Sequence, residues 1–199
     1  FTADGVGGGT WGAVANATNQ PNGRNIGTLR LAARTGANEF LACDKDQNAA
    51  PQIRCYESNH APAWLNPTNQ NLGSTDTGIQ RSFDLAYEKT GGEALVIYSD
   101  TTTIPKLKKY NPNTNTFDLA ATSMTAMPAA VETVRLIPSP DADDIMVLIA
   151  DTAQNLRSEV WNGNTNTFYV SPSGWAATTQ GTSGTADEDY WYDFAWDKF

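Results

Sequence analysis

The side chains that could form a nucleophile and its base are few and lie in one stretch of the sequence. His60 is the only histidine among 199 residues, and the only cysteines are Cys43 and Cys55. A cysteine hydrolase needs a thiol beside a histidine that a third group orients, and the residues around His60 match no such signature. We interpret His60 as a loop residue between strands. We expect no catalytic residue, so the sequence predicts that the protein is not an enzyme.

Cys43 and Cys55 are better explained as a disulfide bond. They lie twelve positions apart, at or near the ends of two consecutive expected strands. Such positions can face each other in an antiparallel hairpin. A disulfide would form in an oxidising compartment, and the alternative is a pair of buried thiols.

One acidic segment has the residue types of a calcium loop. Asp44, Asp46 and Asn48 place three oxygen ligands at alternate positions, but the turn glycine and the closing glutamate of an EF-hand are missing. These residues are a candidate Ca²⁺ site, with a solvated hairpin tip as the alternative, and no other cofactor is expected. A second acidic turn, open to the same two interpretations, contains Asp141, Asp143 and Asp144.

Carboxylate pairs could act as acid and base in glycoside hydrolysis. The candidates Asp84, Glu88, Asp193 and Asp197 fall at matching positions of two similar segments, residues 83–88 and 192–197. Repetition of this kind indicates a scaffold role for these carboxylates.

A longer repeat underlies this match. Residues 110–117 (YNPNTNTF) recur as residues 161–168 (WNGNTNTF), with six of eight identical at a spacing of 51 residues. The apolar runs at 94–100 and 145–151 precede them at the same spacing, and both end in Asp. An earlier copy has the same order of an apolar run, Asp and aromatic residues, and it lies at residues 40–44, 53–56 and 64.

Each unit is expected to hold four short strands, because apolar and polar residues alternate and turn formers separate the segments. In the second unit these strands are expected near Trp64 and at 81–88, 93–99 and 106–110. No window has a convincing helical period, so the sequence predicts an all-β protein.

These four-stranded antiparallel units resemble the blades of β-propellers, in particular blade repeats of bacterial and archaeal cell-surface proteins. The resemblance covers about residues 11–199 and implies tandem, β-propeller-like units, with paired β-sandwiches as the alternative. A Gly-rich arm at 1–10 would precede a single repeat domain at 11–199. Its units would span about 11–63, 64–116 and 117–167, with a partial unit at 168–199.

The composition points to the cell exterior. Only 18% of the residues are charged, and the net charge of −9 would repel a nucleic-acid backbone. The sequence has no run of about 18 apolar residues, so we expect no membrane insertion. One N-glycosylation sequon begins at Asn16, and it would matter only in an exported protein.

Three and a half units cannot close a ring of about four to eight blades. The last residues are strongly aromatic, and Tyr192, Phe194 and Trp196 alternate, so they are expected to share one face. Their cover could be the N-terminal arm, another copy of the chain, or further repeats of a longer precursor. Contact with another copy would be head to tail and would give a ring or a filament.

The leading hypothesis is therefore an extracellular, self-assembling structural protein of a filament or surface layer. Its partners would be other copies of itself. The alternative is a secreted binding module that recognises glycans or a protein through loop aromatics such as Trp175 and Trp191.

Overall fold

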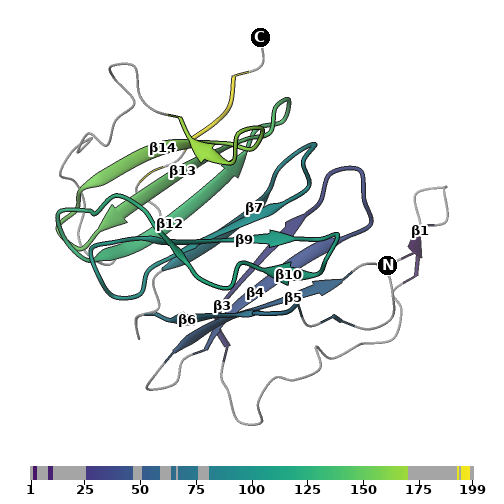
Figure 1. The fold of residues 1–199 in the computed structure, drawn as a ribbon, viewed down its shortest axis with the longest axis horizontal. Helices are drawn as coiled ribbons and strands as arrows, with labels where there is room; N and C mark the ends of the chain where they lie inside the picture. Colours follow the sequence, from purple (N-terminus) through teal and green to yellow (C-terminus); the bar gives the residue numbers. More distant parts are fainter. Residues whose placement is uncertain are drawn as a thin grey trace.

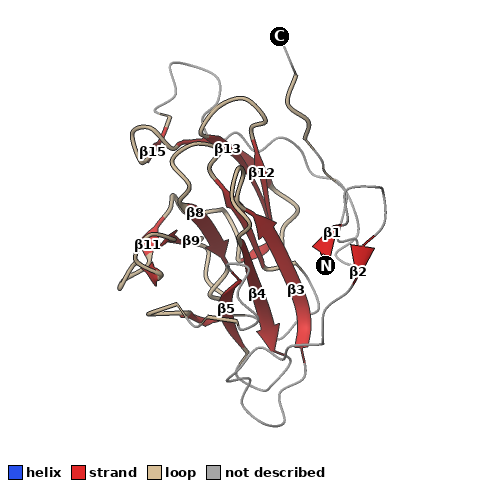
Figure 2. Ribbon diagram, turned by 90° about the vertical axis from the view of Figure 1, so that its right-hand side faces the viewer, coloured by secondary structure: helices blue, strands red, loops and turns tan. Residues whose placement is uncertain are grey.

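The computed structural model describes residues 2–3, 9–10, 26–46, 51–58, 64–65, 67–75, 81–169, 192 and 194–197. Three antiparallel sheets make up its body, and they follow one another along the chain (Figure 1). No described segment is a helix (Figure 2), so none offers the long apolar helix that would cross a membrane. The prediction of an all-β protein is confirmed.

The strands of each sheet follow the chain in order, except that β11 pairs with β9. The N-terminal sheet contains β3 (Ile26–Ala33), β4 (Phe40–Asp46), β5 (Gln52–Ser58) and β6 (Asn71–Ser74). The middle sheet contains β7 (Phe83–Tyr87), β8 (Ala94–Tyr98), β9 (Lys106–Asn111), β10 (Thr116–Phe117) and β11 (Thr122–Ser123). The C-terminal sheet contains β12 (Val131–Pro138), β13 (Asp144–Asp151), β14 (Leu156–Asn162) and β15 (Thr167–Phe168). A separate pair is formed by β1 (Thr2–Ala3) and β2 (Gly9–Thr10).

The two similar Asn-rich segments have the same turn geometry. Asn115 and Asn166 occupy the same place in the two repeated Asn-Thr-Asn-Thr segments, and both have left-handed backbone angles, φ 51° and 55°. Asparagine tolerates this region better than most residues. Each turn therefore leads into a short fourth strand, β10 in one sheet and β15 in the next.

The sheets pack through their faces, and the first strand of each sheet contacts the first strand of the next. We call β3, β7 and β12 the inner strands; β7 contacts both of the others. Every residue of β7 and β8 is buried. Since successive residues of a strand point to opposite faces, both faces of the middle sheet are covered.

Two apolar cores fill the two interfaces. The first lies between the N-terminal and middle sheets and includes Leu41, Cys43, Phe83 and Val96. The second lies between the middle and C-terminal sheets, and its members include Leu95, Ile97, Val134, Val147 and Trp161. The described residues thus form a stack of three sheets with sandwich-like interfaces, and they do not show a closed ring.

The strand expected near Trp64 is not part of the middle sheet. Leu65 forms an isolated bridge to Glu57 on β5, and the Trp64 ring packs edge-on against Phe40 with centroids 5.1 Å apart. The following Thr68 reaches the middle sheet through an isolated parallel bridge to β10. The middle sheet instead begins at β7. The predicted arm and unit boundaries stay predictions, because much of residues 1–25 lies outside the described residues.

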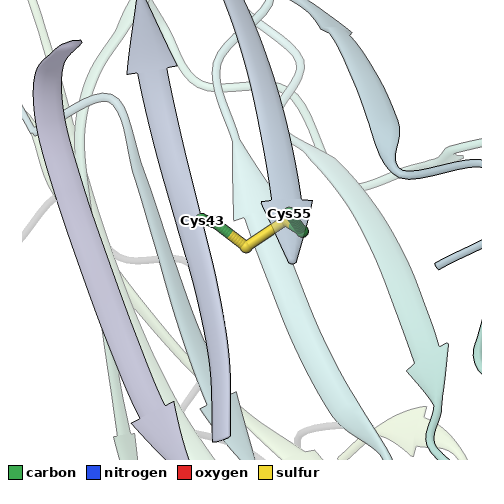
Figure 3. The surroundings of a disulfide bond; sticks show 2 residues. All are labelled: Cys43 and Cys55. Atoms are coloured by element: carbon green, nitrogen blue, oxygen red, sulfur yellow. A yellow bond between two sulfur atoms is a disulfide. The ribbon is translucent and has the colours of Figure 1, made fainter. Parts of the chain in front are cut away.

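The predicted disulfide between Cys43 and Cys55 is present (Figure 3). The two residues are direct partners in the antiparallel register of β4 and β5. Both side chains are fully buried in the first core. A disulfide of this kind is typical of an oxidising compartment outside the cytoplasm.

Reducing this disulfide should destabilise the fold. The bridge closes a loop with a sequence separation of 12, and the chain-entropy model gives about 3 kcal/mol for a loop of that size. Denaturant unfolding with and without reductant measures the difference, and a Cys43→Ala/Cys55→Ala variant should not respond to reductant. Equal alkylation of the cysteines with and without reductant would show that no bridge exists.

Candidate functional site

A single buried carboxylate joins the three inner strands. Asp84 on β7 is 1% exposed. Its Oδ1 accepts a hydrogen bond from Arg30 Nε on β3 at 2.9 Å, and its Oδ2 accepts one from the Leu136 backbone N–H on β12 at 2.8 Å. Arg81 also donates to Oδ2. Two guanidinium groups and one peptide N–H therefore compensate the buried charge, and the inner strands are held in a defined order.

A second polar junction lies where the hairpins of the middle and C-terminal sheets meet. Glu88 is 2% exposed, and its Oε1 accepts a hydrogen bond from the Trp161 indole at 2.9 Å. Asp143 Oδ1 accepts the Gly91 backbone N–H at 3.3 Å. A Cβ on Gly163 would lie 2.5 Å from the Asp143 carbonyl oxygen and 2.7 Å from the Glu88 carboxyl carbon, so this position requires glycine.

The environment of Glu88 favours its neutral form. Burial is the main cause that raises the pKa of its carboxyl, while the Trp161 hydrogen bond acts in the opposite direction. The carboxylates of Glu93 and Asp143 add to the increase in this pKa. Ionised Glu88 therefore lowers the free energy of unfolding, and the size of this effect depends on pH.

On the outer face of the N-terminal sheet, the exposed apolar side chains belong to the edge strand β3, whereas the residues of β4 paired with them are buried. Ile26, Leu29 and Leu31 of β3 are 50%, 52% and 59% exposed. Leu29 and Leu31 point away from the middle sheet, because the alternate residues Arg30 and Ala32 contact it. Figure 2 shows β3 at the edge of its sheet, in the foreground beside β4.

The repeat identifies the face to which these leucines belong. Leu31 pairs with Ala42, as Leu85 pairs with Val96 and Leu136 with Val147 in the next two sheets. The side chains equivalent to Leu31, those of Leu85 and Leu136, are buried in the cores against the preceding sheet. In the first sheet the same position is exposed.

The C-terminal residues predicted for assembly lie along β12 of their own chain. The hydroxyls of Tyr192 and Thr133 are 2.6 Å apart, and Trp196 Nε1 donates to the Ile137 carbonyl at 3.1 Å. The rings of Phe194 and Trp196 meet edge to face at 5.3 Å. Burial raises the pKa of the Tyr192 phenol to about 12, so its hydroxyl remains protonated at neutral pH. The described residues of this segment are not in a strand, and their role in assembly stays a prediction.

The two acidic segments differ in burial, and Asp141 of the second turn is exposed, as expected for a solvated tip. Asp44 and Asp46 are buried on β4, and Asp143 is buried and bonded to the neighbouring hairpin. Asn48 lies outside the described residues. Within the described part of the chain, no group of three or more His, Cys, Asp or Glu side chains could hold a metal ion. The calcium site stays a prediction.

Other candidates fall outside the structure or take a structural role. Asn16, His60, Trp175 and Trp191 lie outside the described residues. Cys43 and Cys55 are consumed in the disulfide and provide no thiol nucleophile. The exposed leucines of β3 were not predicted as functional residues, although the repeat spacing could have identified them as inter-sheet residues.

Comparison with known proteins gives a limited picture. No family model matches the sequence, and no curated protein matches it. Among solved structures, the chain is similar to a xylan β-1,4-xylosidase from Bacillus halodurans C-125, with a TM-score of 0.47 and 12% sequence identity. The match covers 76% of this chain but only 31% of the xylosidase.

The prediction that the protein is not an enzyme is not upheld, since the similar solved structure is that of a xylosidase. The lack of a catalytic signature in the sequence is therefore not a basis for excluding activity, and we correct that prediction. At this identity and TM-score, the similarity carries no argument about a reaction or a substrate.

Replacing the Glu88 carboxyl with an amide should stabilise the protein at neutral pH. Because the folded-state pKa is raised, the folded state binds more protons than the unfolded state between the two pKa values. The contribution of Glu88 to stability is therefore highest below the ordinary glutamate pKa and falls as pH rises through the folded-state value. Glu88→Gln removes this loss and keeps an oxygen that can accept the Trp161 N–H.

Unfolding of both proteins across a series of pH values measures the effect, with about 1.4 kcal/mol for each pKa unit. The gain from Glu88→Gln should vanish in acid. Trp161→Phe keeps an aromatic ring but removes the donor, and it should enlarge the loss of stability with rising pH. A Glu88→Gln variant that is destabilised equally at every pH would contradict this account.

Proposed function

We propose that the protein is an extracellular, self-assembling structural subunit whose copies join head to tail in a filament or surface layer. The observation that carries this proposal is the exposed apolar row of Ile26, Leu29 and Leu31 on β3. Exposed apolar patches that form a row on one element mark association surfaces more often than scattered apolar residues do.

A second copy of the chain is the occupant that best fits this row. In the other two sheets the equivalent face packs against the sheet before it, through residues such as Leu85 and Leu136. The exposed side chains of β3 thus have the chemistry of an inter-sheet contact, beside paired residues of β4 that are already buried. Another copy would supply sheets built from the same repeat.

The complementary end of the next copy would be its C-terminal sheet with residues 192 and 194–197. Phe194 and Trp196 lie beside β12, in the position that follows the last inner strand. Contact between this end and β3 of a neighbour is heterologous, because different surfaces meet. Such contacts extend into a filament unless the rotation closes a ring.

The compartment is also consistent with this proposal. The buried disulfide fits an oxidising environment, and the low charge content resembles that of many secreted proteins. The resemblance of the repeat to blade repeats of bacterial and archaeal cell-surface proteins supports a surface location.

Charge placed on the exposed row should prevent assembly. Leu29→Lys/Leu31→Lys adds two cations to side-chain positions that are about half exposed, so the fold should remain intact. The contact between copies should be lost, because the charges would have to be buried in it. Sedimentation velocity and negative-stain electron microscopy over a range of concentrations measure the change. Leu119→Lys is the matched control, because Leu119 is an isolated apolar residue that is 84% exposed.

Wild-type protein that remains monomeric at high concentration would overturn the proposal, as would polymers that form equally well with the double lysine variant. Trp196→Ala tests the other surface of the proposed contact between copies. We expect it to weaken assembly, and thermal melting of the isolated subunit would separate this effect from loss of the Trp196 contact with Ile137.

A further inference from the structure

An open groove of about 370 Å³ lies between the outer strands of the middle and C-terminal sheets. One wall comes from β9, β11 and the residues that follow β11, and the other from β14 and β15. Met124, Trp161 and Phe168 contribute apolar surface, while Lys109, Glu159 and Asn166 are among the polar lining residues. This groove is distant in sequence and in sheet order from the exposed row on β3.

A buried ion pair fixes one side of the groove. Arg157 is 6% exposed, and its guanidinium donates to the Thr125 carbonyl at 2.8 Å and to the Glu159 carboxylate. The guanidinium therefore ties the segment after β11 to β14. Burial raises the pKa of Glu159, whereas Arg157 opposes this change. The Glu159 carboxylate is held in place as a hydrogen-bond acceptor at the groove.

The positively charged residue that lines the groove, Lys109, is also paired within the protein. Lys109 Nζ donates to Glu93 Oε2 at 3.3 Å and to Asn166 Oδ1 at 3.1 Å. Each charged group that faces the groove thus has a partner of the same chain. A charged ligand would find no uncompensated opposite charge, so the lining favours a neutral ligand rich in hydrogen-bonding groups.

Aromatic surface completes the lining. The rings of Trp161 and Phe168 meet edge to face at 5.2 Å, and Phe168 is only partly buried. Ligand sites combine such apolar surfaces with a few fixed polar groups. A sugar ring presents apolar C–H faces and a rim of hydroxyls, which matches an aromatic surface surrounded by carboxylate, amide and hydroxyl groups.

We propose that this groove binds a neutral oligosaccharide. Thr122, Ser123 and Thr167 also line the groove. The Ser123 hydroxyl accepts from the Lys106 ammonium and the Thr167 hydroxyl pairs with that of Thr165, yet a hydroxyl can form a further hydrogen bond. The Phe168 ring would pack against a sugar face. The Glu159 carboxylate would accept hydrogen bonds from sugar hydroxyls, and the Asn166 amide nitrogen would donate to them. This site is independent of the assembly proposed above.

Titration of the 199-residue protein with hexasaccharides of β-1,4-linked glucose, mannose and N-acetylglucosamine tests the proposal. Isothermal calorimetry should detect binding of at least one of them, with little dependence on salt because the ligand is neutral. Phe168→Ala should weaken this binding by about tenfold, a change of about 1.4 kcal/mol. Tyr169→Ala is the matched control, since Tyr169 is the adjacent aromatic residue, is exposed, and does not line the groove.

Thr122→Arg provides a variant that does not depend on a buried residue. Thr122 is exposed on β11, so a long side chain there should fill the groove, leave the melting temperature unchanged and abolish binding. Three outcomes would overturn the proposal: no binding of any of the three hexasaccharides, binding that survives Thr122→Arg, or binding of peptides in place of oligosaccharides.

Discussion

The buried carboxylate of Asp84 is the constraint on which the arrangement of the sheets depends. An ionised carboxylate that is removed from water is costly unless it is paired and hydrogen-bonded. Asp84 on β7 meets this requirement with the nearby Arg81, with Arg30 of β3 and with the peptide N–H of Leu136 on β12. Because the last two donors come from the preceding and the following sheet, satisfying one side chain fixes the positions of all three inner strands. The two apolar cores then form on either face of the middle sheet.

A stack of sheets always has two end faces, and whether each face is covered determines whether the stack can associate with another molecule. The middle sheet is protected because both of its faces have a neighbour. At the beginning of the described stack, the same pattern of residues leaves Leu29 and Leu31 half exposed. Repeat proteins usually cover such ends with polar caps. An apolar end on an otherwise well-packed stack is the physical reason to relate the repeat to association between copies.

The sequence was informative about local structure and less so about long-range placement. The spacing of 51 residues and the Asn-rich turns predicted equivalent strands, and Asn115 and Asn166 indeed share one backbone conformation. The facing cysteines could also be predicted, since an antiparallel hairpin sets their register. Alternation does not reveal which sheet a strand joins, so the segment near Trp64 was misplaced. Nor does it show which carboxylates are buried, because the partner of Asp84 on β3 lies 54 residues away. The groove was missed for the same reason, since its walls come from separate sheets.

The two proposed surfaces occupy different parts of each sheet, and this separation has a consequence. The exposed row lies on β3, an inner strand, whereas the groove lies between the outer strands β9 and β14. Head-to-tail contacts along the inner strands would therefore leave the groove of each copy accessible. A filament would present one groove per subunit at a regular spacing, and a polymeric glycan could engage several of them at once. Because linked binding events gain avidity without any new contact, a weak oligosaccharide site on one subunit would become a strong site on the assembled polymer.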